Sequence, residues 1–314
     1  MFLGISRETK TLLCVLRASV VKIGFWTSMT QSMKSEILKY DETSPGRLEC
    51  AVDLSALYRS NLEFATFRER YNSFRLCDEY TRRVYELRGK RLLYRSEQLV
   101  PFKTNKKPPL LLIFGNPASH SVVAGCFFAF KDGRENGFWK HLLGNAGVLK
   151  FGLQEGDMEK EQNRVRMEQV LSLDYESPFR IGLCVYISMP SPAGGPWSGV
   201  AGIRRLFGAS SLKQVEALET ARILGLARRF LTDRGVAVTF QRNAWEGLRS
   251  ESDPHYSIGN AREGKLRGSL RGMPSIRLLG VPPTRLLGPA RELLRRLLCE
   301  EGYKLMPGQR HGGG

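Results

Sequence analysis

The chain has 314 residues, of which 42% are hydrophobic and 25% are charged, and this balance excludes a wholly disordered protein. Six cysteines are too sparse for a small disulfide scaffold, and the length suggests roughly one or two domains. The unusual quantity is the formal net charge of +17, which results from 48 Lys and Arg against 31 Asp and Glu. A surplus of this size favours a polyanionic partner, with nucleic acid expected before an anionic membrane surface.

The N-terminus and the cysteines bear on location. Arg17 and Lys22 interrupt the apolar run near the N-terminus, so a secretory signal fits poorly, while a transit peptide and an upstream start of translation stay open. No stretch reaches the roughly 18 uninterrupted apolar residues of a membrane span. No cysteines have C-x-x-C spacing and no histidine lies at ligand spacing from one, which argues against a zinc or iron–sulfur site. We expect no metal and no cofactor. The cysteines are then expected as buried thiols in a reducing compartment, cytoplasmic, or nuclear if the organism has a nucleus.

The composition along the chain suggests three parts. Residues 1–54 are expected to be an N-terminal extension that is partly disordered or that results from translation at an upstream start codon. Residues 306–314 are expected to be a disordered tail. Residues 55–305 are expected to form a single α/β domain. Apolar residues recur at three- to four-residue intervals near its start, which predicts N-terminal helices over residues 55–97.

Four short apolar runs are typical of strands that are buried on both faces. They span residues 110–114, 181–187, 236–240 and 275–279, and helical patterns cover residues 135–145, 211–234 and 288–301. The alternation predicts an α/β sandwich with a central, mostly parallel, four-stranded sheet. Ligands in such folds bind beyond the carboxyl ends of the strands. Two segments are expected as inserts, a solvated surface at residues 154–168 and a mobile loop or nucleic-acid arm at residues 249–273.

The loop after the first predicted strand carries an ordered series of motifs. It reads Gly-Asn-Pro-Ala-Ser-His-Ser over residues 115–121, followed by Gly-Cys-Phe-Phe-Ala-Phe over 125–130 and Asn-Gly-Phe-Trp-Lys over 136–140. This series resembles the uracil-DNA glycosylase superfamily, nearest to its mismatch-specific uracil/thymine branch. The chain departs from that pattern in two places, since the glycine–asparagine pair lacks the intervening residue and Gly137 replaces the usual arginine.

The resemblance implies a three-layer α/β/α sandwich and a monofunctional DNA glycosylase of base excision repair. Such an enzyme flips a deaminated or mismatched base of the uracil type out of DNA and hydrolyses its N-glycosidic bond. Asn116 matches the position that holds the attacking water, which an asparagine orients without deprotonating. Phe128 matches the aromatic residue that stacks on the flipped base. The base-binding loop also contains Gly115, Pro117, Ser119 and His120, with backbone N–H groups expected to stabilise the leaving base.

The loop after the second strand is rich in proline and glycine between residues 188 and 199. By the resemblance, Ser188 or Met189 takes the place of an asparagine that reads the pyrimidine edge, which leaves uracil specificity open because methionine is only a weak acceptor. Ser191 and Ser198 are expected to contact DNA. An opposite alignment, in which Met-Pro-Ser is the family's last, DNA-clamping motif, also stays open.

The loop after the fourth strand matches that last motif by position. Arg285 is expected to contact phosphate there and Leu286 to fill the vacated base stack, with Thr284 as a further DNA-binding residue. A plain turn before a helix is the competing interpretation. The expected histidine is absent, since Val281 or Pro282 holds its place, and only the remote His255 could substitute.

Three functions stay open. The first is the DNA glycosylase, expected to be a monomer that binds duplex or single-stranded DNA without a membrane partner. The second is a catalytically inactive nucleic-acid-binding protein that retains the fold, and the third is another base or nucleotide hydrolase. Residues 262–310 carry 11 Lys and Arg against 4 Glu, a net +7, which suits any of these with a polyanionic ligand.

Overall fold

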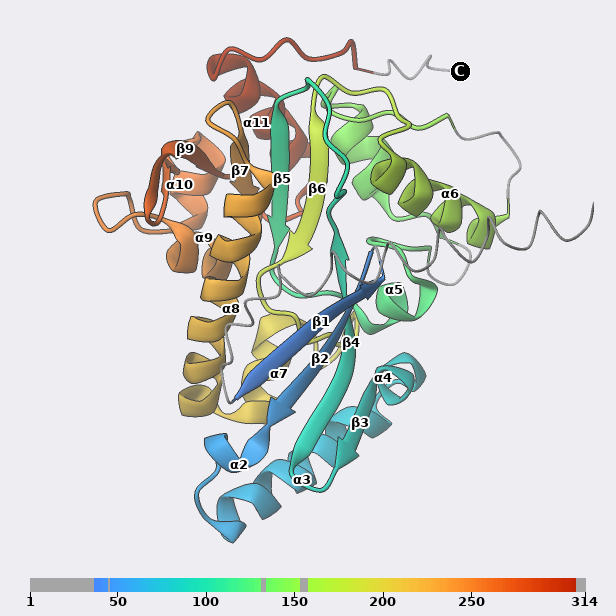
Figure 1. Ribbon diagram of the computed structural model, residues 1–314, viewed down its shortest axis with the longest axis vertical. Coiled ribbons are helices and arrows are strands. Elements are labelled where there is room, and N and C mark those ends of the chain that lie inside the picture. Colours follow the sequence, from blue (N-terminus) through green and yellow to red (C-terminus); the bar gives the residue numbers. More distant parts are fainter. Residues whose placement is uncertain (1–36, 45, 131–133, 153–157, 309–314) are drawn as a thin grey trace, which may run out of the picture. The chain divides into compact units, whose positions relative to one another are not determined.

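The computed structural model describes residues 37–44, 46–130, 134–152 and 158–308, which have an α/β fold (Figure 1). Among these residues the sheet has nine strands in the order β1-β2-β4-β6-β5-β7-β9-β8, and β3 pairs with β4 off this path. The strands are β1 Leu38–Ser44, β2 Gly46–Asp53, β3 Tyr85–Arg88, β4 Arg91–Leu99, β5 Pro109–Phe114, β6 Arg180–Val185, β7 Val236–Thr239, β8 Arg267–Leu270 and β9 Met273–Gly280.

The four strands predicted from apolar runs lie next to one another in this sheet. They are β6, β5, β7 and β9, and each pairs in parallel with its neighbour, so that β5 and β7 are the inner two. All residues of β5, β6 and β7 are buried, because a parallel sheet with helices on both faces needs apolar residues on both sides of each strand. The sheet is larger than the four strands that were expected. Five further strands belong to it, and their antiparallel pairs make the whole sheet mixed.

The antiparallel extension on one side of the sheet differs from the sequence prediction. Strands β1 and β2 lie in residues assigned to the N-terminal extension, and the predicted helical segment 55–97 is helical only as far as Val84. Beyond it, β3 and β4 form a hairpin in which Leu92 and Tyr94 face the core while Arg91 is exposed. This alternation with period two is that of a strand with one buried face. The end of β4 joins the central sheet by pairing with β6.

Helices cover both faces of the central sheet. The helices are α2 Leu54–Leu57, α3 Asn61–Leu76, α4 Glu79–Val84, α5 Ser119–Ala124, η1 Phe138–Gly144, α6 Glu159–Ser172, α7 Gly199–Phe207, α8 Ala209–Phe230, α9 Arg242–Leu248, α10 Ile258–Glu263 and α11 Leu287–Glu300. Leu111 and Ile113 of β5 belong to one core cluster, which also contains apolar residues of α8. Leu112 and Phe114 belong to a second cluster with residues of η1 and α11. Consecutive residues of β5 therefore enter opposite layers of the fold.

The two predicted inserts are folded where the structure describes them. Helix α6 buries Asn163 and Arg166, so the segment is more than a solvated surface. Helix α10 and β8 replace the predicted mobile arm, and the Asp253 carboxylate accepts hydrogen bonds from the backbone N–H groups of Ser250 and Ser269, both at 3.0 Å. Sequence composition could not show these pairings because Asp253 lies 16 residues from Ser269.

The ends of the chain are only partly described. The Met306 N–H donates to the carbonyl of Gly147 at 3.0 Å, so the predicted disordered tail begins with an ordered residue. Residues 309–314, and the predicted extension up to residue 36, lie outside the described residues. No helix in the described part of the chain is long and apolar enough to cross a membrane.

Candidate functional site at the carboxyl ends of the central strands

Asn116 lies directly beyond the carboxyl end of β5, half-buried, and its side-chain nitrogen is bound from the neighbouring loop. Nδ2 donates to the Met189 carbonyl at 3.1 Å and to Ser191 Oγ at 2.9 Å, with a longer contact to its neighbour Pro117 at 3.3 Å. Because a carbonyl can only accept, the nitrogen must be the atom that faces Met189. The Asn116 Oδ1 accepts no hydrogen bond from the described residues, which leaves this oxygen able to bind water or a ligand.

The loops after β5 and β6 continue to pair beyond their strands. The Ile187 N–H donates to the Gly115 carbonyl at 2.7 Å, and Ala118 forms a parallel bridge with Ser191. The Ser191 N–H donates to the carbonyl of Pro117 at 3.0 Å. Two segments separated by about 70 residues thus form one rigid rim around Asn116, as the strand-end rule predicts.

Phe128 packs beside this rim in an unusual backbone conformation. Its φ of 50° lies in the left-handed region, which is uncommon for a residue with a bulky side chain. The half-buried ring stacks on Phe138 with centroids 4.0 Å apart and meets Phe114 edge-on at 5.0 Å. Backbone strain of this kind persists only where surrounding packing imposes it, and it is concentrated at functional sites. The aromatic contacts therefore fix Phe128 close to the strand that carries Asn116.

Three of the predicted base-binding side chains point into the protein. Ser119 and Ser188 are fully buried; Ser119 Oγ accepts from Thr81 at 2.9 Å, and Ser188 Oγ lies 2.8 Å from the Tyr94 hydroxyl. Met189 is also fully buried, so that only its backbone carbonyl reaches Asn116. The sequence pattern could not separate these residues from exposed ones, because small polar residues at strand ends serve internal hydrogen bonds as readily as ligands.

His120 is half-buried at the first turn of α5. Its Nε2 lies 3.4 Å from Ser121 Oγ, and its ring meets the ring of Tyr80 at a tilt of 66° and a centroid distance of 6.1 Å. These contacts place the imidazole between α4 and α5.

The predicted DNA-binding residues are divided between surface and interior. Arg285 is exposed and Thr284, Leu286 and Ser198 are half-buried, which suits residues that meet a ligand at the rim. Ser191 is 2% exposed, and its hydroxyl accepts from Asn116 and from the Gly199 N–H at 2.8 Å. Its hydroxyl thus stabilises the rim from within, and at this burial the predicted contact of Ser191 with DNA stays untested.

The last loop and position 137 lack the side chains that the sequence resemblance predicts. Val281 is fully buried and Pro282 is buried, and neither side chain has a titratable group. His255 is 82% exposed and lies 2.7 Å from Arg249 Nη2 and 3.2 Å from Glu246 Oε2, away from the described contacts of Asn116. A side chain at Gly137 would begin 2.7 Å from Leu287 Cδ1, so the usual arginine does not fit there without displacement of that leucine.

Sequence reasoning missed three residues at the same end of the sheet. A Cβ on Gly115 would lie 2.9 Å from Gln241 Cγ, which places the Gln241 side chain over the Gly115 backbone. Arg242 follows at the start of α9, and burial raises the pKa of Tyr256 while the positive charges of Arg285 and Arg242 oppose that rise. The two arginines thus approach one tyrosine from adjacent strand-end loops. The signal was available, since Gln-Arg directly follows the third predicted strand.

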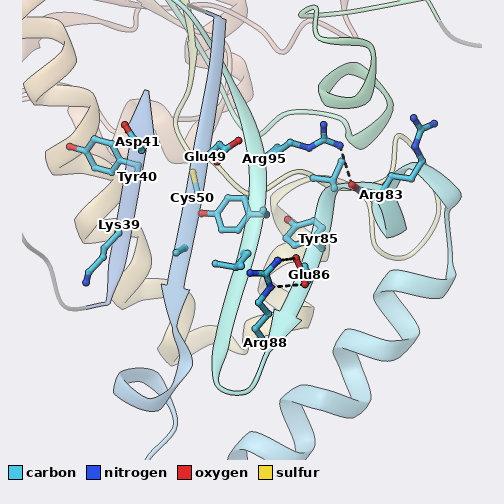
Figure 2. Close-up of a pocket in the computed structure, with 14 residues that line it drawn as sticks. Lys39, Tyr40, Asp41, Glu49, Cys50, Arg83, Tyr85, Glu86, Arg88 and Arg95 are labelled. Carbon is cyan, nitrogen blue, oxygen red and sulfur yellow. Dashed lines mark hydrogen bonds and ion pairs between the residues drawn. The ribbon is translucent and has the colours of Figure 1, made fainter. Parts of the chain in front are cut away.

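A separate hollow of about 540 Å³ lies on the face of β1, β2, β4 and β3 (Figure 2). Its walls carry charges of both signs, and Arg88 Nε lies 2.6 Å from Glu86 Oε1 in an ion pair. Burial raises the pKa of the Cys50 thiol in its floor to about 12, so this cysteine stays protonated and unreactive at neutral pH. None of the predicted site residues lines this hollow.

Neither a metal-binding cluster nor a match to a known family identifies the function of this site. The described residues contain no group of His, Cys, Asp and Glu side chains that could hold a metal ion. No protein-family model matches the chain, and a search of curated proteins finds no match either.

Proposed function

We propose that the protein is a monofunctional DNA glycosylase of the uracil-DNA glycosylase type, which hydrolyses the N-glycosidic bond of a deaminated or mismatched base. One observation carries the proposal. The Asn116 carboxamide is held by its nitrogen at the carboxyl end of the inner strand β5, with its oxygen free of hydrogen bonds from the described residues. The adjoining parallel strands β6-β5-β7-β9, with a core on each side, are compatible with the three-layer sandwich of that superfamily.

The geometry of Asn116 suits a residue that orients water. Glycosidic cleavage passes through an oxocarbenium-like transition state, and water must approach the sugar from one face. A carboxamide oxygen accepts a hydrogen bond from that water and fixes its direction, while its low basicity limits the rate gained from proton transfer. The base would lie against Phe128, whose position is imposed by Phe138 and Phe114.

Gln241 would supply the carboxamide that the second strand lacks. Its side chain lies against Gly115, one residue before Asn116, and makes no hydrogen bond with the described residues. A carboxamide presents both a donor and an acceptor, which complements the edge of a uracil-like base. We therefore assign the reading of the base edge to Gln241 in place of Ser188 and Met189.

The partner in this proposal is DNA, bound by a monomer in the cytoplasm or nucleus. Arg242 and Arg285 have no ion pair with any described carboxylate and lie on adjacent loops next to the site. Two unpaired guanidinium groups at a rim are suited to phosphates on either side of a flipped nucleotide. Leu286 at the start of α11 would fill the vacated stack.

A second candidate is a nucleic-acid-binding protein that has the fold without the chemistry. The specific observation in its favour is the last loop, where buried Val281 and Pro282 stand in place of a histidine that would stabilise the leaving base. The rim arginines fit this candidate as well as the first.

The test uses duplex and single-stranded oligonucleotides that contain uracil, hypoxanthine, xanthine or mismatched thymine, followed by alkaline cleavage of abasic sites. We expect the wild type to give cleaved product from at least one substrate. We expect Asn116→Ala to lose this activity. Asn260→Ala is the matched control, since Asn260 is a half-buried asparagine on α10 whose Nδ2 donates to the His255 carbonyl at 3.3 Å. Salt-sensitive binding without product from any substrate would refute the enzyme and support the second candidate.

A further inference from the structure

A buried ion pair on α8 lies directly behind the loop that holds Asn116. Arg222 Nε donates to Glu219 Oε2 at 2.6 Å, and both side chains are almost completely buried, with exposed fractions of 2% and 0%. Removal of two charges from water costs several kcal/mol per ion, and a hydrophobic pair of similar size is often at least as stable. The role of this ion pair is therefore better judged from the groups that it contacts than from its own contribution to stability.

The contacts of the pair converge on one short segment. Glu219 Oε1 accepts from the Ser188 N–H at 2.7 Å and also from the Ser188 hydroxyl. Arg222 Nη2 donates to the Val185 carbonyl at 2.6 Å, and Nη1 donates to Gln98 Oε1 of β4 at 3.1 Å. The ion pair thus fixes the last residues of β6 and the first residue of the loop that follows.

Two buried tyrosines brace the same segment from the hairpin. Tyr85 of β3 and Tyr94 of β4 are cross-strand partners, with ring centroids 5.4 Å apart. The Tyr94 hydroxyl lies 2.8 Å from Ser188 Oγ, and the Tyr85 hydroxyl donates to the Pro190 carbonyl at 2.6 Å. Met189, whose carbonyl accepts from Asn116, therefore lies between two anchored residues.

We propose that Tyr85, Tyr94, Glu219 and Arg222 are positioning residues that set the orientation of the Asn116 carboxamide. They do so through the backbone of residues 185–190, which places the Met189 carbonyl and leads into Ser191, the two acceptors of Asn116 Nδ2. The inference rests on the proposed function for its kinetic consequence. Its structural content, a coupling between Tyr85 and Asn116, can be measured independently of catalysis.

Tyr85→Phe is the informative variant. It removes only the hydroxyl that binds Pro190, whereas Glu219→Gln would leave the Arg222 charge buried without a counterion and could prevent folding. Tyr58→Phe is the matched control, because the Tyr58 hydroxyl also donates to a backbone carbonyl inside the protein, that of Phe207 at 2.8 Å. Both tyrosines are buried.

The first readout is the side-chain amide signal of Asn116 in protein labelled with ¹⁵N-asparagine, assigned by its absence in Asn116→Ala. We expect Tyr85→Phe to shift this signal and accelerate its hydrogen exchange, while Tyr58→Phe leaves it unchanged. An Asn116 signal that is identical in Tyr85→Phe and the wild type would overturn the proposal, whether or not the protein cleaves DNA.

The second readout is kinetic. With a substrate that the wild type cleaves, we expect Tyr85→Phe to lower kcat about tenfold with little change in KM, because a small misplacement of a water-orienting group acts on the chemical step. In an Asn116→Ala background, whose much lower residual rate is measured with protein in excess over many hours, the same substitution is expected to have no further effect. Equal losses in both backgrounds would contradict the coupling. Absence of cleavage by the wild type would count against the proposed function alone, and the amide signal would still decide the positioning role.

Discussion

Glu97 allows a quantitative prediction because it is a buried acid to which no described residue donates at Oε1. It lies on β4 with 3% of its surface exposed, and its Oε1 is buried without a hydrogen bond from the described part of the chain. Burial raises the pKa of this carboxyl from 4.5 to about 8, since a carboxylate loses its hydration in the interior. The native protein therefore holds a proton on Glu97 at neutral pH that the unfolded chain releases.

The sign of the pH effect follows from this difference. Between about pH 4.5 and pH 8 the native state binds one proton more than the unfolded state, so the free energy of unfolding falls as the pH rises. Each pKa unit corresponds to about 1.4 kcal/mol, so the loss attributable to Glu97 approaches about 5 kcal/mol by pH 8 and ceases beyond it. Below pH 4.5 both states are protonated and the effect vanishes.

Urea unfolding at pH 5, 6, 7 and 8 measures this loss. We expect Glu97→Gln to resemble the wild type at pH 5 and to exceed it progressively at higher pH, by about 3 kcal/mol at pH 7. Glu49→Gln is the control, because Glu49 is exposed on the adjacent strand β2. The free energies of unfolding of Glu97→Gln and the wild type would instead run parallel from pH 5 to 8 if the carboxyl were ionised in the native state. That result would refute the reasoning.

Three further predictions concern the site and its frame. Arg242→Ala and Arg285→Ala should each reduce the slope of log K against log salt for DNA binding by about 1, measured by fluorescence anisotropy; an unchanged slope would remove that arginine from the interface. Phe128→Ala should raise KM or lower kcat for every base by about tenfold, since stacking on a base contributes about 1–3 kcal/mol. Gly202→Ala would place a Cβ 1.8 Å from the Trp197 carbonyl oxygen, so thermal unfolding should show a loss of at least about 1–3 kcal/mol.

The central strands could be predicted because their signal is local. A continuous run such as Leu110 to Phe114 can be buried on both faces only inside a sheet, and β5 is buried throughout. The hairpin of β3 and β4 could not be predicted in the same way. Its charged residues fall within a stretch whose apolar spacing also fits a helix. The strand conformation of β4 is stabilised by pairing with β2 and β6, which are distant in sequence.

The site shows the same division between local and distant information. Asn116 was predicted from its motif and its place after a strand, both of which are local. The burial of Ser191, and its bond to Asn116, depend on the bridge between Ala118 and Ser191, a register that no sequence pattern records. The position of Gln241 directly after the third predicted strand was a local signal, but its contact with Gly115 across two adjacent strands was not visible in the sequence.

The glycosylase proposal contains no histidine that would stabilise the leaving base, and this determines how the proposal must be tested. A positioned general acid or base contributes about 10²–10⁴-fold to a rate, and the residues that the proposal aligns with that histidine, Val281 or Pro282, are buried and carry no such group. Asn116 and the backbone N–H groups of its loop must then provide most of the remaining acceleration, which predicts slow turnover. A single-turnover assay with protein in excess over many hours is therefore the measurement that separates a slow enzyme from a binding protein. If product still accumulates at the rate of the protein-free control, the orientation of Asn116 supports an internal hydrogen-bond network and no hydrolysis.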